Sequence, residues 1–139
     1  MGTIRQTVTI AGVTPRELYD AFLNSRQHSA MTGGRARMSA RIGGAWTAWD
    51  ESLSGRNVEL VPGKRIVQTW RGSDFPERDH STLTLTLARS TTGARVTLRQ
   101  TDVPDDLAAS YAQGWRDYYW TPMKAYFEGR RKTASRRAR

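Results

Sequence analysis

The stretch STLTLTLA, residues 81–88, alternates threonine and leucine at every second position. Because successive side chains of a β-strand point to opposite faces, this alternation predicts a strand with one buried and one solvated face. The stretch RVTLR, residues 95–99, repeats the alternation after the turn residues Thr92 and Gly93, and by the same parity Arg99 faces solvent. The two stretches therefore predict a pair of antiparallel strands.

Further strands extend from this pair toward the N-terminus. Residues 35–100 consist of short strand-like segments divided by turns that contain glycine or proline, which is typical of an antiparallel meander. Residues 1–10 also alternate, with Ile4, Val8 and Ile10 on one side, and predict a first strand. Together these segments predict an antiparallel sheet of about seven strands.

Two short helices are expected between the first strand and the meander. The run TPRE, residues 14–17, has the pattern of a capping box with proline at the first helical position, which predicts a helix over residues 15–23. Asn24 or Ser25 caps a second short helix that continues to about Met31.

A long helix is expected to close the chain after Pro104, where the apolar spacing changes from two residues to three and four. Pro122 lies inside this helix, lacks a backbone N–H and clashes one turn back, so a kink or break is predicted near Trp120 and Thr121. Gly129 is the expected end of the helix.

Positive charge is concentrated at the C-terminus. The chain carries 22 Lys and Arg against 13 Asp and Glu, a net charge of +9, and six of the basic residues lie in residues 130–139. Without those six, 16 basic residues remain against 13 acidic ones, so residues 1–129 carry only +3. We predict a single domain at 1–129 and a disordered basic tail at 130–139, which lacks large apolar side chains. The tail is expected to make only weak, nonspecific contact with nucleic acid.

Several protein classes are disfavoured by composition. The chain has no cysteine, so disulfides and thiolate metal sites are excluded. The alternating N-terminus lacks the unbroken apolar run of a signal peptide or membrane span, and Gln6 stands where a myristoylation signal needs Ser or Thr. These features predict a cytoplasmic protein without membrane attachment.

Four runs of the sequence stand out in combination and spacing. They are GGAWTAWDESLSG at Gly43–Gly55, ELVPGKRIVQTWRG at Glu59–Gly72, FPERDHSTLTLTL at Phe75–Leu87 and QGWRDYY at Gln113–Tyr119. Together they resemble the C-terminal domain of the activator of heat-shock-chaperone ATPase, a family of the START-like (SRPBCC) superfamily. The similarity spans about residues 4–129.

The resemblance implies an α+β helix-grip fold. In this fold a curved antiparallel sheet, here of about seven strands, wraps around a long C-terminal helix, with two short helices after the first strand. The cavity between sheet and helix holds lipids, sterols or polyketides in various relatives. In the eukaryotic activator a similar domain contacts the chaperone, while a separate N-terminal domain supplies most of the ATPase stimulation. We expect 139 residues to leave no room for that second domain, which makes a co-chaperone-like binding module in the stress response the implied role.

The aromatic residues are candidates for lining such a cavity, because apolar walls with a few polar tips are typical of ligand sites. Trp70 shares a strand face with Ile66, and Trp115 lies on the apolar stripe of the closing helix, so these two tryptophans are expected to meet. A filled core is an equally good interpretation of the same pattern. The residues expected to line the cavity are His28, Met31, Trp46, Trp70, Tyr111, Trp115 and Tyr118.

No catalytic or metal-binding motif occurs in the sequence. The two histidines, His28 and His80, lie far from any carboxylate pattern typical of a metal site, and no nucleophile elbow or phosphate-binding glycine loop is present. Both histidines are expected at the surface or in loops, with His28 at the cavity mouth. No catalytic residue, metal or cofactor is therefore assigned.

Two classes of function follow from these observations. The leading hypothesis is a non-enzymatic module that binds a small apolar ligand in its cavity, a heat-shock chaperone, or both. The alternative is a cyclase- or hydrolase-type enzyme that uses His28 or a cavity tyrosine as acid or base.

Overall fold

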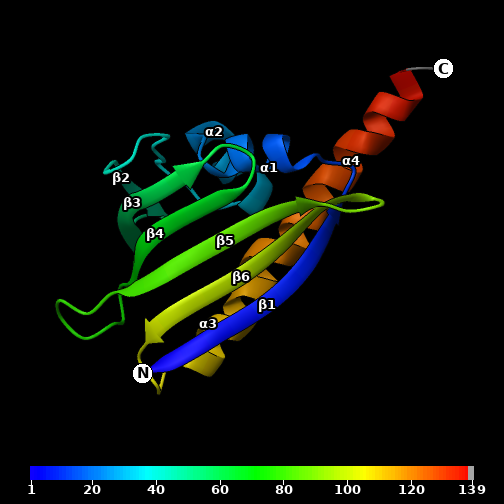
Figure 1. Cartoon of the computed structure of the whole chain (residues 1–139). Helices are drawn as coiled ribbons and strands as arrows, with labels where there is room; N and C mark the ends of the chain where they lie inside the picture. Colours follow the sequence, from blue (N-terminus) through cyan, green and yellow to red (C-terminus); the bar gives the residue numbers. More distant parts are fainter. Residues whose placement is uncertain (138–139) are drawn as a thin grey trace.

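The computed structural model describes residues 1–137 and consists of one curved antiparallel sheet and a long C-terminal helical rod (Figure 1). The sheet has the order β1-β6-β5-β4-β3-β2, so β2 to β6 form a meander and β1 joins the far side of β6. The strands are β1 (Gly2–Ala11), β2 (Ala45–Ala48), β3 (Leu53–Val61), β4 (Arg65–Gly72), β5 (Ser81–Arg89) and β6 (Gly93–Val103).

The alternation in residues 81–88 has the predicted consequence. Leu85 of β5 lies opposite Leu98 of β6, and Leu87 lies opposite Val96, with all four side chains buried. These side chains face the helical rod, so one face of the sheet forms the core. The threonines and arginines between them are on the other face, as predicted for Arg99.

The prediction of about seven strands is wrong by one, because the sheet has six. The segment before β2 makes only an isolated bridge between Arg37 and Thr47. The buried amide of Asn57 instead binds the carbonyls of Ser39 and Arg41, at 2.7 and 3.0 Å. These two carbonyls are therefore satisfied by a side chain, and the segment needs no neighbouring strand.

The two short helices follow β1 as predicted, at α1 (Pro15–Phe22) and α2 (Ser25–Thr32). The capping box at the start of α1 is complete, because Thr14 Oγ1 accepts from the Glu17 N–H and the Thr14 N–H donates to the Glu17 carboxylate. Asn24 caps α2 by accepting from the Gln27 N–H at 3.0 Å.

The closing rod is continuous and has three parts, which are α3 (Ala108–Trp115), a π-helical turn η1 (Arg116–Trp120) and α4 (Thr121–Arg137). The irregularity that Pro122 predicts near Trp120 takes the form of this π-turn rather than a break, and the Thr121 N–H bonds the Arg116 carbonyl five residues back. The side chain of Gln6 on β1 donates to the Ala112 carbonyl at 2.7 Å.

The expected helix end at Gly129 is wrong, because α4 continues through this residue to Arg137. The disorder of residues 130–139 and the domain boundary at 129 stay predictions. The last two residues of that tail lie outside the described residues.

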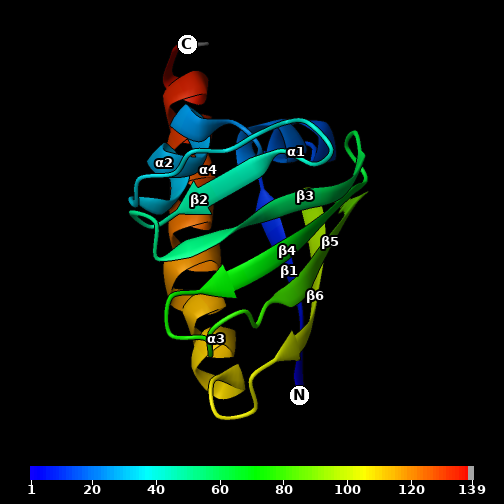
Figure 2. The ribbon, with the colours of Figure 1, turned by 90° about the vertical axis from the view of Figure 1, so that its left-hand side faces the viewer.

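The helical rod lies along the concave face of the sheet, with α1 and α2 beside α4 and far from α3 (Figure 2). This arrangement is the helix-grip fold that the resemblance implies. None of the helices within residues 1–137 has the length and apolar character needed to cross a membrane.

Candidate functional site: an aromatic pocket between helix and sheet

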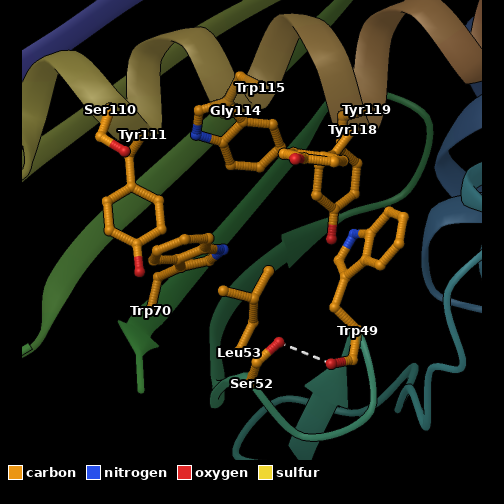
Figure 3. A pocket seen from close by; sticks show the side chains of 10 residues that line it. All are labelled: Trp49, Ser52, Leu53, Trp70, Ser110, Tyr111, Gly114, Trp115, Tyr118 and Tyr119. Carbon is orange, nitrogen blue, oxygen red and sulfur yellow. Dashed lines mark hydrogen bonds between the residues drawn. The ribbon is translucent and has the colours of Figure 1, made fainter. Parts of the chain in front are cut away.

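A pocket of about 280 Å³ lies between the α3–η1 part of the rod and strands β3 and β4 (Figure 3). Its walls are mostly aromatic, and no charged side chain lines it. The lining residues are Trp49, Ser52, Leu53, Trp70, Ser110, Tyr111, Gly114, Trp115, Tyr118 and Tyr119.

One face of the helix supplies the upper wall. Ser110, Gly114 and Tyr118 are spaced four residues apart, which places them in one row on the rod. Figure 3 shows Tyr111 and Trp115 pointing from the rod toward Trp70 on β4. Because Ser110 and Gly114 carry small or no side chains, this row leaves space that larger residues would fill.

The aromatic rings contact one another edge to face or at a tilt. The Trp70 and Tyr111 ring centroids are 5.1 Å apart at 89°, and those of Trp70 and Trp115 are 5.9 Å apart at 35°. The predicted meeting of Trp70 and Trp115 is thereby confirmed. At the other end Trp49 meets Tyr118 at 5.5 Å and 70°. Such contacts stabilise a rigid apolar wall.

A buried hydrogen-bond chain holds Trp115 in place. The indole N–H of Trp115 donates to Gln100 Oε1 at 2.8 Å, and Gln100 Nε2 donates to Ser81 Oγ at 2.8 Å. The Ser81 hydroxyl donates in turn to the Trp70 carbonyl at 2.8 Å. Each side chain in this series of hydrogen bonds has a partner, which offsets the cost of burying its polar groups and fixes the Trp115 ring in the pocket wall.

Tyr111 connects the pocket to the loop between β4 and β5. Its hydroxyl donates to Asp74 Oδ1. Burial, together with this hydrogen bond and the Asp74 charge, raises the Tyr111 pKa well above its ordinary value, so the phenol stays protonated. The guanidinium of Arg71 bonds three carbonyls within residues 75–79 of the same loop. Both contacts hold the loop against this end of the pocket.

The turn between β2 and β3 carries Trp49 in a strained conformation. Trp49, Asp50 and Glu51 all have positive φ, at 51°, 55° and 74°. The Trp49 ring covers Gly34 so closely that a Cβ added there would clash with it. Its indole N–H is buried without a hydrogen-bond partner in the described chain. Three such backbone positions and an unpaired donor are each unfavourable, by about 1–3 kcal/mol.

His28 is buried rather than at a surface or cavity mouth, so its expected position is wrong. Its Nδ1 lies 2.8 Å from the Phe22 carbonyl, and its Nε2 lies 3.1 Å from the Tyr119 hydroxyl. Since a carbonyl only accepts, Nδ1 carries the hydrogen and Nε2 accepts from Tyr119. Burial lowers the His28 pKa to about 4, and burial raises the Tyr119 pKa above its ordinary value. Both groups are therefore neutral near pH 7.

The predicted site residues divide into two groups. Four of them, Trp70, Tyr111, Trp115 and Tyr118, line the pocket. The other three do not: His28 and Met31 are buried on α2, and Trp46 is buried on β2.

Trp46 is kept from the pocket by its strand neighbour. It lies opposite Gly55 of β3. Because an added Gly55 Cβ would be 2.9 Å from the Trp46 indole nitrogen, the ring packs over that glycine.

Six lining residues lie outside the predicted list. Trp49 and Tyr119 belong to the aromatic residues that the sequence offers as general candidates, whereas Ser52, Leu53, Ser110 and Gly114 were not predicted. Ser110 and Gly114 flank the predicted aromatic stripe at helical spacing, so the stripe itself contained a signal for them. Ser52 and Leu53 come from the turn and the start of β3, for which sequence offers no such signal. No group of three or more potential metal ligands gathers anywhere in the described part of the chain.

Comparison with known proteins places the chain in a family. Residues 12–128 match the family described as activator of Hsp90 ATPase homolog 1-like protein. The human activator of 90 kDa heat shock protein ATPase homolog 1 is 32% identical over 114 residues, which are 82% of this chain and 34% of the human protein. A Dictyostelium discoideum homologue is 31% identical over 106 residues, 74% of this chain and 27% of its own length. The chain thus spans about a third of the length of these relatives.

Solved structures also superpose on this chain, and one of them is an HSP90 activator. An HSP90 activator from Plasmodium falciparum superposes with a TM-score of 0.74 at 20% identity, covering 89% of this chain and 93% of the other. A protein from Chromobacterium violaceum gives a TM-score of 0.73 at 28% identity, covering 91% and 96%. The chain therefore belongs to the activator of Hsp90 ATPase homolog 1-like family and has its START-like fold.

Proposed function

We propose that this domain is a non-enzymatic binding module that holds a small, uncharged, largely apolar ligand in the aromatic pocket. The observation that carries the proposal is an open volume of about 280 Å³ walled by aromatic rings, of which Trp115 and Tyr119 are held by buried hydrogen bonds. This volume lies just below the range of about 300–1,000 Å³ that is typical of ligand pockets, so the pocket suits a small ligand.

The chemistry of the lining defines the ligand further. Because no Arg, Lys, Asp or Glu lines the pocket, a charged ligand would lose its hydration without gaining a counter-ion. Exposed hydroxyls at Ser110 and Tyr118 offer hydrogen bonds at the rim, and Ser52 Oγ, which donates to the Trp49 carbonyl at 2.6 Å, can still accept one. A flat ring system with one hydroxyl or carbonyl group matches both features.

The buried titratable pair supports a role without catalysis. A general acid or base works best when its pKa is near the operating pH. The pKa of His28 is lowered to about 4 and that of Tyr119 is raised, so proton exchange between them is strongly unfavourable at neutral pH. Their hydrogen bond positions the Tyr119 ring in the pocket wall. The cyclase or hydrolase alternative stays a hypothesis that requires another acid or base.

Ligand binding is tested with 2-naphthol, an uncharged two-ring phenol, titrated into the protein by isothermal calorimetry. The blocking variant is Gly114→Leu, because a Cβ at Gly114 meets only Tyr118, at 3.8 Å, and the rest of the leucine enters the pocket. Its control is Gly129→Leu, on the same rod, where an added Cβ meets nothing within 4 Å. We expect saturable binding that only Gly114→Leu weakens, by at least about tenfold. No binding to the unmodified chain, or equal binding to both variants, would contradict the proposal.

A second candidate function is contact with a 90 kDa heat shock chaperone. The observation that favours it is the match over 82% of this chain to a relative named as an activator of that chaperone's ATPase. The test combines the protein with the 90 kDa chaperone of its own organism and measures association and ATP turnover. We expect association, with a change in turnover if the domain alone suffices. Absence of both effects would remove this function.

Nucleic-acid binding through the basic tail stays a hypothesis. It predicts salt-sensitive binding to duplex DNA that disappears when the chain is cut after Gly129. Binding that survives the cut would assign it to the folded domain.

A further inference from the structure

The outer face of strands β1, β6 and β5 carries arginine and threonine side chains side by side. This surface, here called the arginine/threonine face, points away from the helical rod, because the apolar residues between its members are buried against the rod. Its residues are Arg5, Thr7 and Thr9 on β1, Arg95, Thr97 and Arg99 on β6, and Thr84 and Thr86 on β5.

Two of these arginines are placed directly opposite each other. Arg5 and Arg99 are register partners on adjacent antiparallel strands, with Thr7 and Thr97 as the next outward-facing pair. Like charges at directly opposed positions destabilise a sheet. The four residues also line one surface groove between β1 and β6, so two guanidinium groups and two hydroxyls converge there.

The positive charge of this face has no internal compensation. Within the described part of the chain, Arg5, Arg95 and Arg99 form no ion pair, and Glu59 of β3 binds Arg65 of β4 at 3.1 Å. The one acidic residue in the three strands, Asp102, lies near the end of β6. The face is therefore a cationic surface that an anionic partner would neutralise.

The spacing of the charges matches an extended polypeptide. Arg95 and Arg99 lie four residues apart on β6, which is about 13 Å along the strand. Alternate side chains of an extended peptide laid along β6 repeat about every 6.6 Å, half of this distance, so acidic residues at every second position would meet both sites. The three strands contain no aromatic residue on which a base could stack, which favours a protein over single-stranded nucleic acid.

We propose that the arginine/threonine face docks an extended acidic segment of a partner protein, with carboxylates at the Arg5/Arg99 pair and at Arg95. Arg–carboxylate pairing supplies the charge-assisted hydrogen bonds, and the threonine hydroxyls between them donate to the remaining oxygens. The proposal does not depend on the pocket, which opens on the opposite face of the sheet.

The probe is a fluorescein-labelled peptide of five Glu-Thr repeats, with five Gln-Thr repeats as the uncharged control, titrated with the full chain and followed by anisotropy. Arg99→Glu is the test variant. Arg26→Glu is the matched control, because Arg26 is exposed on α2 and the change in net charge is the same. We expect Arg99→Glu to weaken Glu-Thr binding at least about tenfold and Arg26→Glu to weaken it less than about threefold.

The test variant also separates binding from folding. The introduced carboxylate would lie opposite Arg5 and replace a like-charge pair with an ion pair, so the melting temperature of Arg99→Glu is expected to equal or exceed that of the parent chain. Equal weakening by the two variants would overturn the proposal. The proposal would also be overturned if Arg99→Glu weakened binding to duplex DNA or to a phosphatidylserine vesicle at least as much as it weakens binding to the Glu-Thr peptide.

Discussion

The two ends of the helix–sheet interface are built from the same rod and the same sheet, yet one is open and the other is filled. The α3–η1 end encloses about 280 Å³, whereas the α4 end leaves a residual space of about 10 Å³. The filled end is lined by Leu18, Phe22, Ile66, Leu85, Leu87, Val96, Trp120 and Met123.

Two features of the chain account for the difference. At the filled end α1 inserts Leu18 and Phe22 between rod and sheet, and α2 lies beside α4, whereas neither helix reaches α3 (Figure 1). At the open end the rod presents Ser110 and Gly114 where the filled end has Trp120 and Met123. A cavity in this fold therefore results from small residues in an uncovered stretch of helix.

The largest effect is expected from emptying the filled end. Phe22→Ala removes a ring that is 4% exposed and packs on His28 and Tyr119, which should lower the free energy of unfolding by about 3–5 kcal/mol. Tyr118→Ala at the pocket, where the side chain is 58% exposed, should cost less than about 1 kcal/mol. Urea unfolding measures both. Equal costs would show that the two ends do not differ in packing.

Lowering the pH should also destabilise the folded chain through His28 at the filled end. The His28 pKa is about 4 in the folded chain and near 6.5 when unfolded, so only the unfolded state binds the proton between these values. The free energy of unfolding should therefore fall by about 3 kcal/mol in total as the pH is lowered from 6.5 toward 4. The check is urea unfolding from pH 7 to 4, with His28→Gln as the control that should lack this part of the loss. An unchanged pH dependence in the control would assign the effect to other groups.

The boundary between the two ends depends on Trp115, which stacks on Trp120 at 5.3 Å on one side and meets Trp70 on the other. Gln100→Leu leaves the Trp115 N–H without an acceptor and should cost about 1–3 kcal/mol. The released ring should also change the tryptophan emission and weaken 2-naphthol binding. Loss of stability with an unchanged pocket would mean that packing alone positions Trp115.

The smallest effect on stability is expected from replacing a helical glycine at either end of the rod, and the two variants should differ in how they change ligand binding. Gly114→Ala replaces a helical glycine where a Cβ has room, so it should stabilise the chain by about 0.5–1 kcal/mol while narrowing the pocket. Gly129→Ala, at the other end of the rod, should stabilise by a similar amount and leave 2-naphthol binding unchanged. Thermal unfolding and calorimetry measure the two effects. Destabilisation by Gly114→Ala would show that the pocket wall tolerates no added methyl group.

Residues whose structure depends on near neighbours were predictable. The leucine alternation of residues 81–88 determines a strand face, and the contacts from Thr14 to Glu17 span three residues. The missing seventh strand was not predictable in this way. Its segment is held by Asn57, whose partners at Ser39 and Arg41 lie 18 and 16 residues away.

The amino-acid sequence alone was enough to predict the helices, most of the strands and four of the seven expected lining residues, because periodicity assigns side chains to faces. The family came from the resemblance of four sequence runs, and the fold it implies agreed with the order of these elements. The packing of the folded chain was needed to show that the pocket is open, that His28 and Met31 belong to the core, and that Trp46 packs over Gly55. The reason is physical. An empty volume is a property of how elements pack across long sequence separations, and a helical stripe has the same pattern whether its partner fills the space or leaves it open.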